Sequence, residues 1–296
     1  MYNFPIQYEQ PLFRPPSEAR SLILQITSGC SWNKCAFCEM YASKSFKVKP
    51  FEDVQKEIEQ VADSGFVFNK VFLADGDAMV LSANKLNKII CEIKNKFRKV
   101  RRISVYARPS DFAKKSLSEL KELKSAGLDL AYVGAESGDD EVLRNINKGE
   151  TFKTTTEGLL KAKEAGIKLS VMILNGLGGL ELSRQHAVNS AKLINEIQPE
   201  YVSTLVLSMP LGEQHFKNRY AGKFTMLSKF ELIEELGIFL KNTELNQSVF
   251  RSDHASNYLI LKGILSKDKD LLISKIDTVL NHPQSANLRE EFERGL

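Results

Sequence analysis

Six short apolar segments alternate with helix-length amphipathic segments up to residue 207, and this alternation limits the possible folds more than any other feature. The predicted strands are 22–27, 70–74, 103–107, 128–133, 168–174 and 201–207. Apolar residues recur at helical spacing in the segments between them, which are 51–64, 82–97, 116–125, 151–165 and 182–197. Nearly continuous apolar strands separated by helices favour a parallel sheet covered by helices.

The number of β/α units indicates the kind of sheet. Six units are fewer than the eight of a closed TIM barrel, so the pattern predicts an α/β fold, a partial (β/α)6 TIM-like barrel over residues 21–211. Proline-rich residues 1–20 are predicted to form an extended N-terminal arm. Residues 212–296 are predicted to form a mainly helical C-terminal extension packed on the core, with helices over 225–241 and 269–280. Ligands are expected at the C-terminal ends of the strands.

Composition excludes several classes of protein. The 296 residues include 41 basic and 37 acidic ones, and this small excess does not indicate nucleic-acid binding. The chain has no apolar run near the roughly 20 residues that span a bilayer, and its first residues lack the pattern of a signal peptide. We therefore expect a cytoplasmic protein without a membrane segment.

Three of the four cysteines, Cys30, Cys35 and Cys38, follow the first predicted strand with the spacing Cys-x4-Cys-x2-Cys. Clustered thiols in a cytosolic chain favour metal binding over disulfides. A zinc site normally takes four protein ligands, and no further Cys or His lies nearby. A two-iron ferredoxin centre would need Cys91, which lies in an apolar helical pattern and is expected to be a buried structural thiol. A four-iron cluster with one iron free of cysteine is the third interpretation.

The cysteine loop, its place after the first strand and Phe37 before the last cysteine resemble the radical S-adenosylmethionine (SAM) enzymes. The likeness covers roughly residues 20–210, and the segment Gly134-Ala135-Glu136-Ser137-Gly138 resembles the methylthiotransferase, elongator and coproporphyrinogen-dehydrogenase branch. The usual first spacing in this family is one residue shorter. The resemblance implies a [4Fe-4S] cluster on the three cysteines and SAM on the fourth iron. Reductive cleavage of SAM would give a 5′-deoxyadenosyl radical.

The resemblance also implies roles at the ends of later strands. The turn Asp75-Gly76-Asp77-Ala78 stands where the family has a Gly-Gly-Glu turn that binds the SAM amino group. The implied cofactor contacts, in chain order, are Phe37, Gly76, Asp77, Glu136, Ser137, Asn175 and Arg184. Phe37 would lie near the adenine, and Arg184 would pair with the SAM carboxylate.

The substrate is not identified by any motif. The densest polar stretch of the extension offers Arg251, His254 and Asn257 as candidate substrate contacts, with a solvated loop as the alternative. The resemblance implies an electron-donating protein such as flavodoxin or ferredoxin as a partner. A ferredoxin-like electron carrier and a zinc-stabilised binding protein remain the alternative functions.

Overall fold

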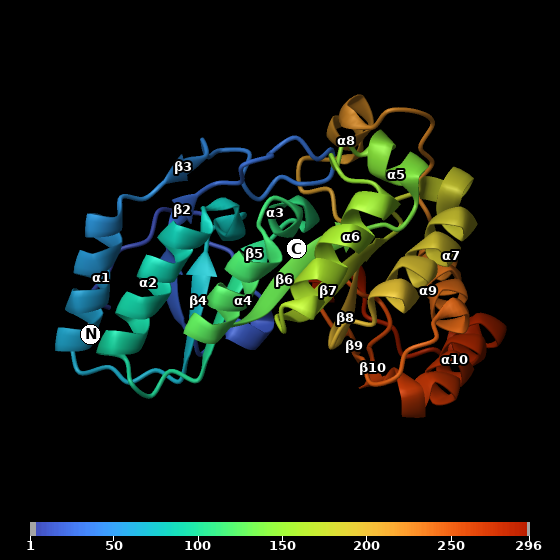
Figure 1. Cartoon of the computed structure of the whole chain (residues 1–296). Helices are drawn as coiled ribbons and strands as arrows, with labels where there is room; N and C mark the ends of the chain where they lie inside the picture. Colours follow the sequence, from blue (N-terminus) through green and yellow to red (C-terminus); the bar gives the residue numbers. More distant parts are fainter. Residues whose placement is uncertain (1–3, 295–296) are drawn as a thin grey trace. The chain divides into compact units, whose positions relative to one another are not determined.

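The computed structural model describes residues 4–294, and the first three residues of the predicted arm lie outside this range. Within the described range the chain forms a mostly parallel eight-stranded sheet with helices, which confirms the predicted α/β class (Figure 1). The strands of this sheet, in spatial order, are β1 (Leu22–Gln25), β4 (Lys70–Ala74), β5 (Arg102–Ala107), β6 (Leu128–Glu136), β7 (Lys168–Asn175), β8 (Tyr201–Val206), β9 (Val249–Ser252) and β10 (Leu261–Ile264). Two further short strands, β2 (Thr27–Ser28) and β3 (Lys47–Val48), pair with each other.

Several helices begin at a residue whose side chain caps them. Ser82 and Ser116 cap two of them by accepting hydrogen bonds from Lys85 N (3.4 Å) and Glu119 N (3.2 Å). The helices are α1 (Phe51–Asp63), α2 (Ala83–Lys96), α3 (Pro109–Ala113), α4 (Leu117–Ala126), α5 (Asp140–Asn145), α6 (Phe152–Glu164), α7 (Gly179–Ile197), α8 (Glu213–Arg219), α9 (Lys229–Asn242) and α10 (Leu265–Asn281). Single 3-10 turns occur at Pro16–Glu18, Ala78–Val80, Pro283–Ser285 and Glu291–Glu293.

The C-terminal extension differs from the expectation in one respect. Besides the predicted helices it contributes β9 and β10 to the sheet, β9 parallel to β8 and β10 antiparallel to β9. Each has four residues, so neither is long enough to give a clear alternating pattern in the sequence. The short helices α5 and α8 were missed for the same reason. No helix within residues 4–294 is both long and apolar enough to cross a membrane.

The chain divides into two compact units. The first runs up to Asn33 and also contains Met40–Val133 and Glu157–Leu169. The second contains Lys34–Glu39, Gly134–Thr156 and everything from Ser170 onward. The cysteine loop is therefore shared, because Cys30 belongs to the first unit, and Cys35 and Cys38 belong to the second.

The described part of the N-terminal arm packs on the sheet of the first unit. Tyr8 and Leu12 lie against a buried cluster that contains Ile23 and Phe72, and the Tyr8 hydroxyl donates to Ile23 O at 3.0 Å. Glu18 is fully buried and accepts hydrogen bonds from Arg102, Ser104 and Tyr132 at 2.5, 3.0 and 2.6 Å. Since a buried carboxylate is stable only with such partners, the arm is fixed in place by specific contacts.

In the second unit, helices cover one face of β8 and β9. Alternate residues of β8, among them Val206, are buried on this face, and Val206 packs with Leu227 and with Leu232 of α9. Within this unit α7, α9 and α10 run beside the last strands (Figure 1). Residues of β8 at the intervening positions, such as Ser203, are only half-buried, so the sheet of this unit has one covered and one open face.

Candidate functional site

The turn after β4 carries two of the predicted cofactor residues and is tied to the start of the cysteine loop. Asp75 is fully buried and forms an ion pair with Lys44, whose Nζ lies 2.8 Å from Asp75 Oδ2. The same oxygen accepts a hydrogen bond from Gly29 N at 3.2 Å, next to Cys30. Asp75 therefore holds the backbone that leads into the first cysteine.

Gly76 and Asp77 lie directly beyond this ion pair. A Cβ atom on Gly76 would overlap the ring of Tyr41, so a side chain does not fit at this position. Asp77 is fully buried and accepts a hydrogen bond from the Ser31 hydroxyl. Its second oxygen, Oδ1, is also buried.

Asp111 supplies a second carboxyl group beside Asp77. Burial, followed by the hydrogen bond and charge of Asp77, raises the pKa of Asp111 to about 8. Its Oδ1 is likewise buried, while Oδ2 accepts from Arg108 N at 2.8 Å. A second negative charge beside Asp77 would be costly, so the Asp111 carboxyl keeps its proton at neutral pH. The sequence marks Asp111 only as a helix-capping residue, because its neighbour Asp77 is distant in the chain.

Asp111→Asn should flatten the dependence of stability on pH. In the folded protein Asp111 keeps its proton up to about pH 8, whereas in the unfolded chain it ionises near its ordinary pKa of 3.8. The folded state thus binds more protons between these values, and wild-type stability should fall as pH rises through them, by up to about 1.4 kcal/mol per pH unit. Urea unfolding at pH 5 and pH 8 measures this fall. Asn keeps an acceptor for Arg108 N but cannot ionise, so the variant should lose less stability.

The exposed Asp63 at the end of α1 provides the matched control for this experiment. Asp63→Asn should leave the wild-type difference between pH 5 and pH 8 unchanged. Equal pH dependence in wild type and Asp111→Asn would show that Asp111 does not keep its proton in the folded protein.

The second half of the cysteine loop is anchored within the second unit. Ala36 N donates to Ile146 O at 2.8 Å, and Arg219 Nη2 at the end of α8 donates to Cys35 O at 2.9 Å. Phe37 packs against an apolar cluster formed by α5, the end of β7 and α8. Arg219 was not recognised from the sequence, because nothing in its local pattern connects it to a loop 184 residues earlier.

The four cysteines are free thiols. Cys35 is buried, and Cys30 and Cys38 are half-buried, as expected of a loop that can bind a metal without being fully open to water. The prediction that Cys91 is buried is wrong, since it lies exposed on α2, with its sulfur 3.6 Å from Asn87 Oδ1. Within residues 4–294 no three His, Cys, Asp or Glu side chains already converge as a metal-binding group. The three loop thiols fit an iron–sulfur cluster by their chemistry, since thiolates are its usual ligands.

Glu136 ends β6 in a conformation that side chains rarely adopt, with φ at +66°. Its carboxylate is buried and pairs with Lys148 at 3.0 Å, and Lys148 Nζ also lies 5.8 Å from the centre of the Phe37 ring. The other carboxylate oxygen, Oε2, is buried without a hydrogen-bond partner among the described residues. An unpartnered buried oxygen is costly, so this acceptor is suited to a donor supplied by a ligand.

Ser137 is held by a polar network that reaches α7. Its hydroxyl lies 2.8 Å from His186 Nδ1 and accepts from Asp139 N at 3.0 Å. His186 Nε2 donates to Leu174 O at 3.2 Å, which connects the ends of β6 and β7. Ser137 is fully buried, so it positions the loop that carries Glu136.

Glu235 of α9 fixes the loop after β7, where Asn175 lies buried. Its two carboxylate oxygens accept from Gly176 N and from the Ser183 hydroxyl, both at 2.6 Å. The pKa of Glu235 is raised, because the effect of burial exceeds the lowering by His186 and by these two donors. Glu235 was missed in the sequence because it lies in the extension, far from the loop that it contacts. Arg184, by contrast, is exposed on α7.

The three candidate substrate residues have different environments. Arg251 is exposed on β9. Asn257 is buried and its side chain donates to Thr204 O at 2.9 Å, which attaches the loop after β9 to β8. His254 is half-buried, Nδ1 lies 2.9 Å from Ser256 Oγ, and burial lowers its pKa. Of these three residues, Arg251 is therefore the one whose side chain is exposed to solvent.

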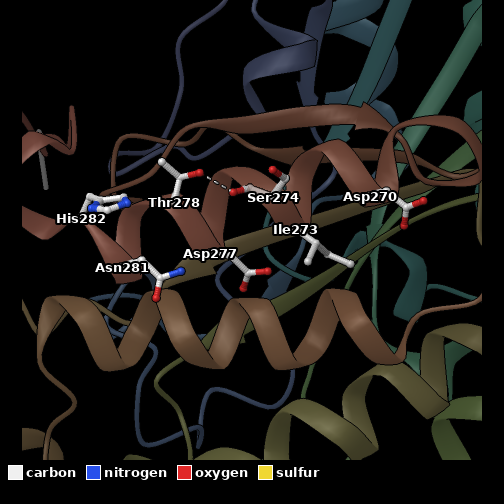
Figure 2. A pocket seen from close by; sticks show the side chains of 7 residues that line it. All are labelled: Asp270, Ile273, Ser274, Asp277, Thr278, Asn281 and His282. Atoms are coloured by element: carbon white, nitrogen blue, oxygen red, sulfur yellow. Dashed lines mark hydrogen bonds between the residues drawn. The ribbon is translucent and has the colours of Figure 1, made fainter.

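The cavities of the second unit lie apart from the predicted site residues. A pocket of about 360 Å³ lies along α10 (Figure 2). It is lined by Asp270, Ile273, Ser274, Asp277, Thr278, Asn281 and His282. A second pocket of about 300 Å³ adjoins α5 and α6 and is lined by Leu143, Arg144, Asn147, Gly149, Glu150, Thr151 and Thr154. Neither contains a predicted cofactor or substrate contact.

Comparison with known proteins identifies the class. The model of the Radical SAM superfamily matches residues 24–194, which is more than half of the chain and includes all three loop cysteines. The chain belongs to the Radical SAM superfamily and is an enzyme of that class. Membership implies a [4Fe-4S] cluster and SAM as cofactors, and confirms the resemblance drawn from the motifs.

Individual relatives are distant. The chain is 25% identical over 185 residues to the 4′-phospho-dehydrooxetanocin synthase of Priestia megaterium, covering 54% of this chain and 25% of the synthase. It is 26% identical over 164 residues to the heme chaperone HemW of Bacillus subtilis, covering 53% and 43%. The chain therefore spans less than half the length of either relative.

Among solved structures, coproporphyrinogen III oxidase (HemN) of Escherichia coli matches with a TM-score of 0.58 at 18% identity. The match covers 75% of this chain and 52% of the oxidase. At this identity the match shows the shared fold.

Proposed function

We propose that this protein binds a [4Fe-4S] cluster through Cys30, Cys35 and Cys38 and reductively cleaves SAM to start a radical reaction on an unidentified substrate. The observation that carries the proposal is the family match over residues 24–194, with the three free thiols inside it. The bound cluster and SAM would supply a 5′-deoxyadenosyl radical, with methionine as the other product of SAM cleavage, and this radical would remove a hydrogen atom from the substrate.

The chain's own residues would bind and orient SAM. Glu136 carries a buried oxygen that has no partner among the described residues, which supports a hydrogen bond to a SAM hydroxyl or amino group. Phe37 would contact the adenine, and Gly76, which packs against the ring of Tyr41, remains a predicted contact of the SAM amino group. Asp77, Ser137, Asn175 and Arg184 remain predicted cofactor contacts. For Ser137 the network to His186 supports a positioning role.

Anaerobic reconstitution with iron and sulfide tests this function. We expect four irons per chain and release of 5′-deoxyadenosine from SAM after reduction by dithionite. A flavodoxin or ferredoxin would replace dithionite as the proposed electron donor. Two irons per chain without SAM cleavage would instead indicate an electron carrier, and zinc without iron or sulfide would indicate a zinc-stabilised binding protein.

A further inference from the structure

The open face of the sheet in the second unit presents a row of side chains from four neighbouring strands. Met172 of β7 is in register with Ser203 of β8, which is in register with Arg251 of β9. Arg251 in turn lies opposite Lys262 of the antiparallel strand β10. Residues in register on adjacent strands point to the same face, so these four side chains lie side by side. Met172 and Ser203 are half-buried and the two cations are exposed.

The two cations of this row have no acidic partner. Arg251 Nη1 makes a long hydrogen bond of 3.4 Å to Phe250 O, and neither Arg251 nor Lys262 forms an ion pair with any residue from 4 to 294. Asp253, the acid closest to Arg251 in the sequence, lies beyond the end of β9 at Ser252. A lysine on an edge strand such as β10 can serve to prevent edge-to-edge aggregation. That explanation does not apply to Arg251, because β9 is paired on both sides.

Apolar side chains border the cations on the same face. The next row toward the N-terminal end of β8 contains Tyr201, in register with Val249, which lies opposite Ile264. Tyr201 is 38% and Ile264 is 37% exposed, so part of their apolar surface remains in contact with water. A cationic pair beside exposed aromatic and aliphatic groups is suited to a ligand with an anionic group on an apolar body.

The row lies close to the second half of the cysteine loop. Two residues after Met172 and Ser203, Leu174 and Leu205 are in register on the same face. Leu174 belongs to the apolar cluster against which Leu205 and Phe37 both pack. Two residues of a strand span about 7 Å, so a ligand bound at the row that contains Arg251 would lie about 7 Å from that cluster.

From this arrangement we infer that Arg251, with Lys262 and Ser203, binds a phosphate or carboxylate group of the substrate. This inference rests on the proposed function for the identity of its ligand as substrate. Phosphate and carboxylate share the ability to take paired hydrogen bonds from a guanidinium, and Lys262 adds a second positive charge. Tyr201 and Ile264 would contact the apolar part of the same molecule.

Calorimetric titration of the reconstituted protein with phenyl phosphate, benzoate and phenol tests the inference. Phenyl phosphate or benzoate should bind detectably, and the comparison of the two shows which anion is preferred, while neutral phenol should bind at least about tenfold more weakly. Arg251→Gln should weaken anion binding by about tenfold or more, and Arg251→Lys should retain part of it. Lys262→Gln should weaken it a few-fold, since it loses one of the two charges.

The exposed Arg98, which follows α2 in the first unit, supplies the control, and Arg98→Gln should bind as wild type does. Anions that bind no better than phenol, or that bind Arg251→Gln as well as wild type, would overturn the inference. The release of 5′-deoxyadenosine by wild type is measured separately. If wild type binds anions through Arg251 but releases no 5′-deoxyadenosine, only the proposed function is contradicted.

Discussion

Cys35→Ala should abolish both the iron–sulfur cluster and SAM cleavage. Cys35 is the buried member of the cysteine loop, and its removal would leave two thiolates where a four-iron cluster with one open iron needs three. We expect reconstituted Cys35→Ala to lose the charge-transfer absorption of the cluster and to release no 5′-deoxyadenosine above background. Iron content, visible absorption and product release measure the three effects.

Cys91→Ala is the matched control for this substitution. Cys91 is exposed on α2 and is separated from the loop in sequence, so its removal should leave iron content and SAM cleavage at wild-type levels. Loss of the cluster in Cys91→Ala, with retention in Cys35→Ala, would contradict the proposed ligands and favour a two-iron centre. Thermal unfolding of both variants checks that any loss does not come from a failure to fold.

Glu136→Gln should weaken SAM binding by roughly 10- to 100-fold. Hydrogen bonds to charged groups contribute about 1.5–3 kcal/mol, and the buried oxygen of Glu136 that lacks a partner among the described residues is the acceptor that SAM would complete. Gln keeps the size of the side chain but removes its charge, and it also weakens the 3.0 Å pairing with Lys148. Equilibrium binding of SAM to the reconstituted protein measures the effect.

Glu141, exposed in the first turn of α5, allows a control at nearly the same place in the chain. Glu141→Gln should bind SAM with wild-type affinity. If Glu136→Gln also binds SAM as wild type does while retaining a full cluster, Glu136 acts only through its ion pair with Lys148, and its assignment as a cofactor contact is wrong.

The sequence was most informative where a pattern is local. The strand at 70–74 was predicted to the residue, because an apolar run there is followed by an Asp-Gly-Asp turn. The resemblance implied Asp77, Glu136 and Asn175 as cofactor contacts, and the structure places all three at or just beyond the ends of predicted strands. Their contacts with SAM stay predictions.

Contacts between distant segments could not be predicted. The raised pKa of Asp111 beside Asp77 and the hydrogen bond that Glu235 accepts from Gly176 N depend on tertiary packing that leaves no local pattern. Cys91 shows a different failure, because it lies next to buried Ile90 in sequence but is rotated by about 100° around the helix, which turns it to water. A helical pattern predicts whether a residue is buried only after that residue has been assigned to the apolar or the polar face of the helix.

The contacts between the C-terminal extension and two loops limit which segments of this protein could be replaced by those of a relative in a chimera. Arg219 reaches the backbone of the cysteine loop and Glu235 reaches the loop after β7, yet both lie beyond residue 194, where the family match ends. A chimera that replaces everything after the matched region would remove both anchors along with β9 and β10. In this chain the matched region and the segment that follows it are therefore not interchangeable modules, so recombination would have to transfer them together.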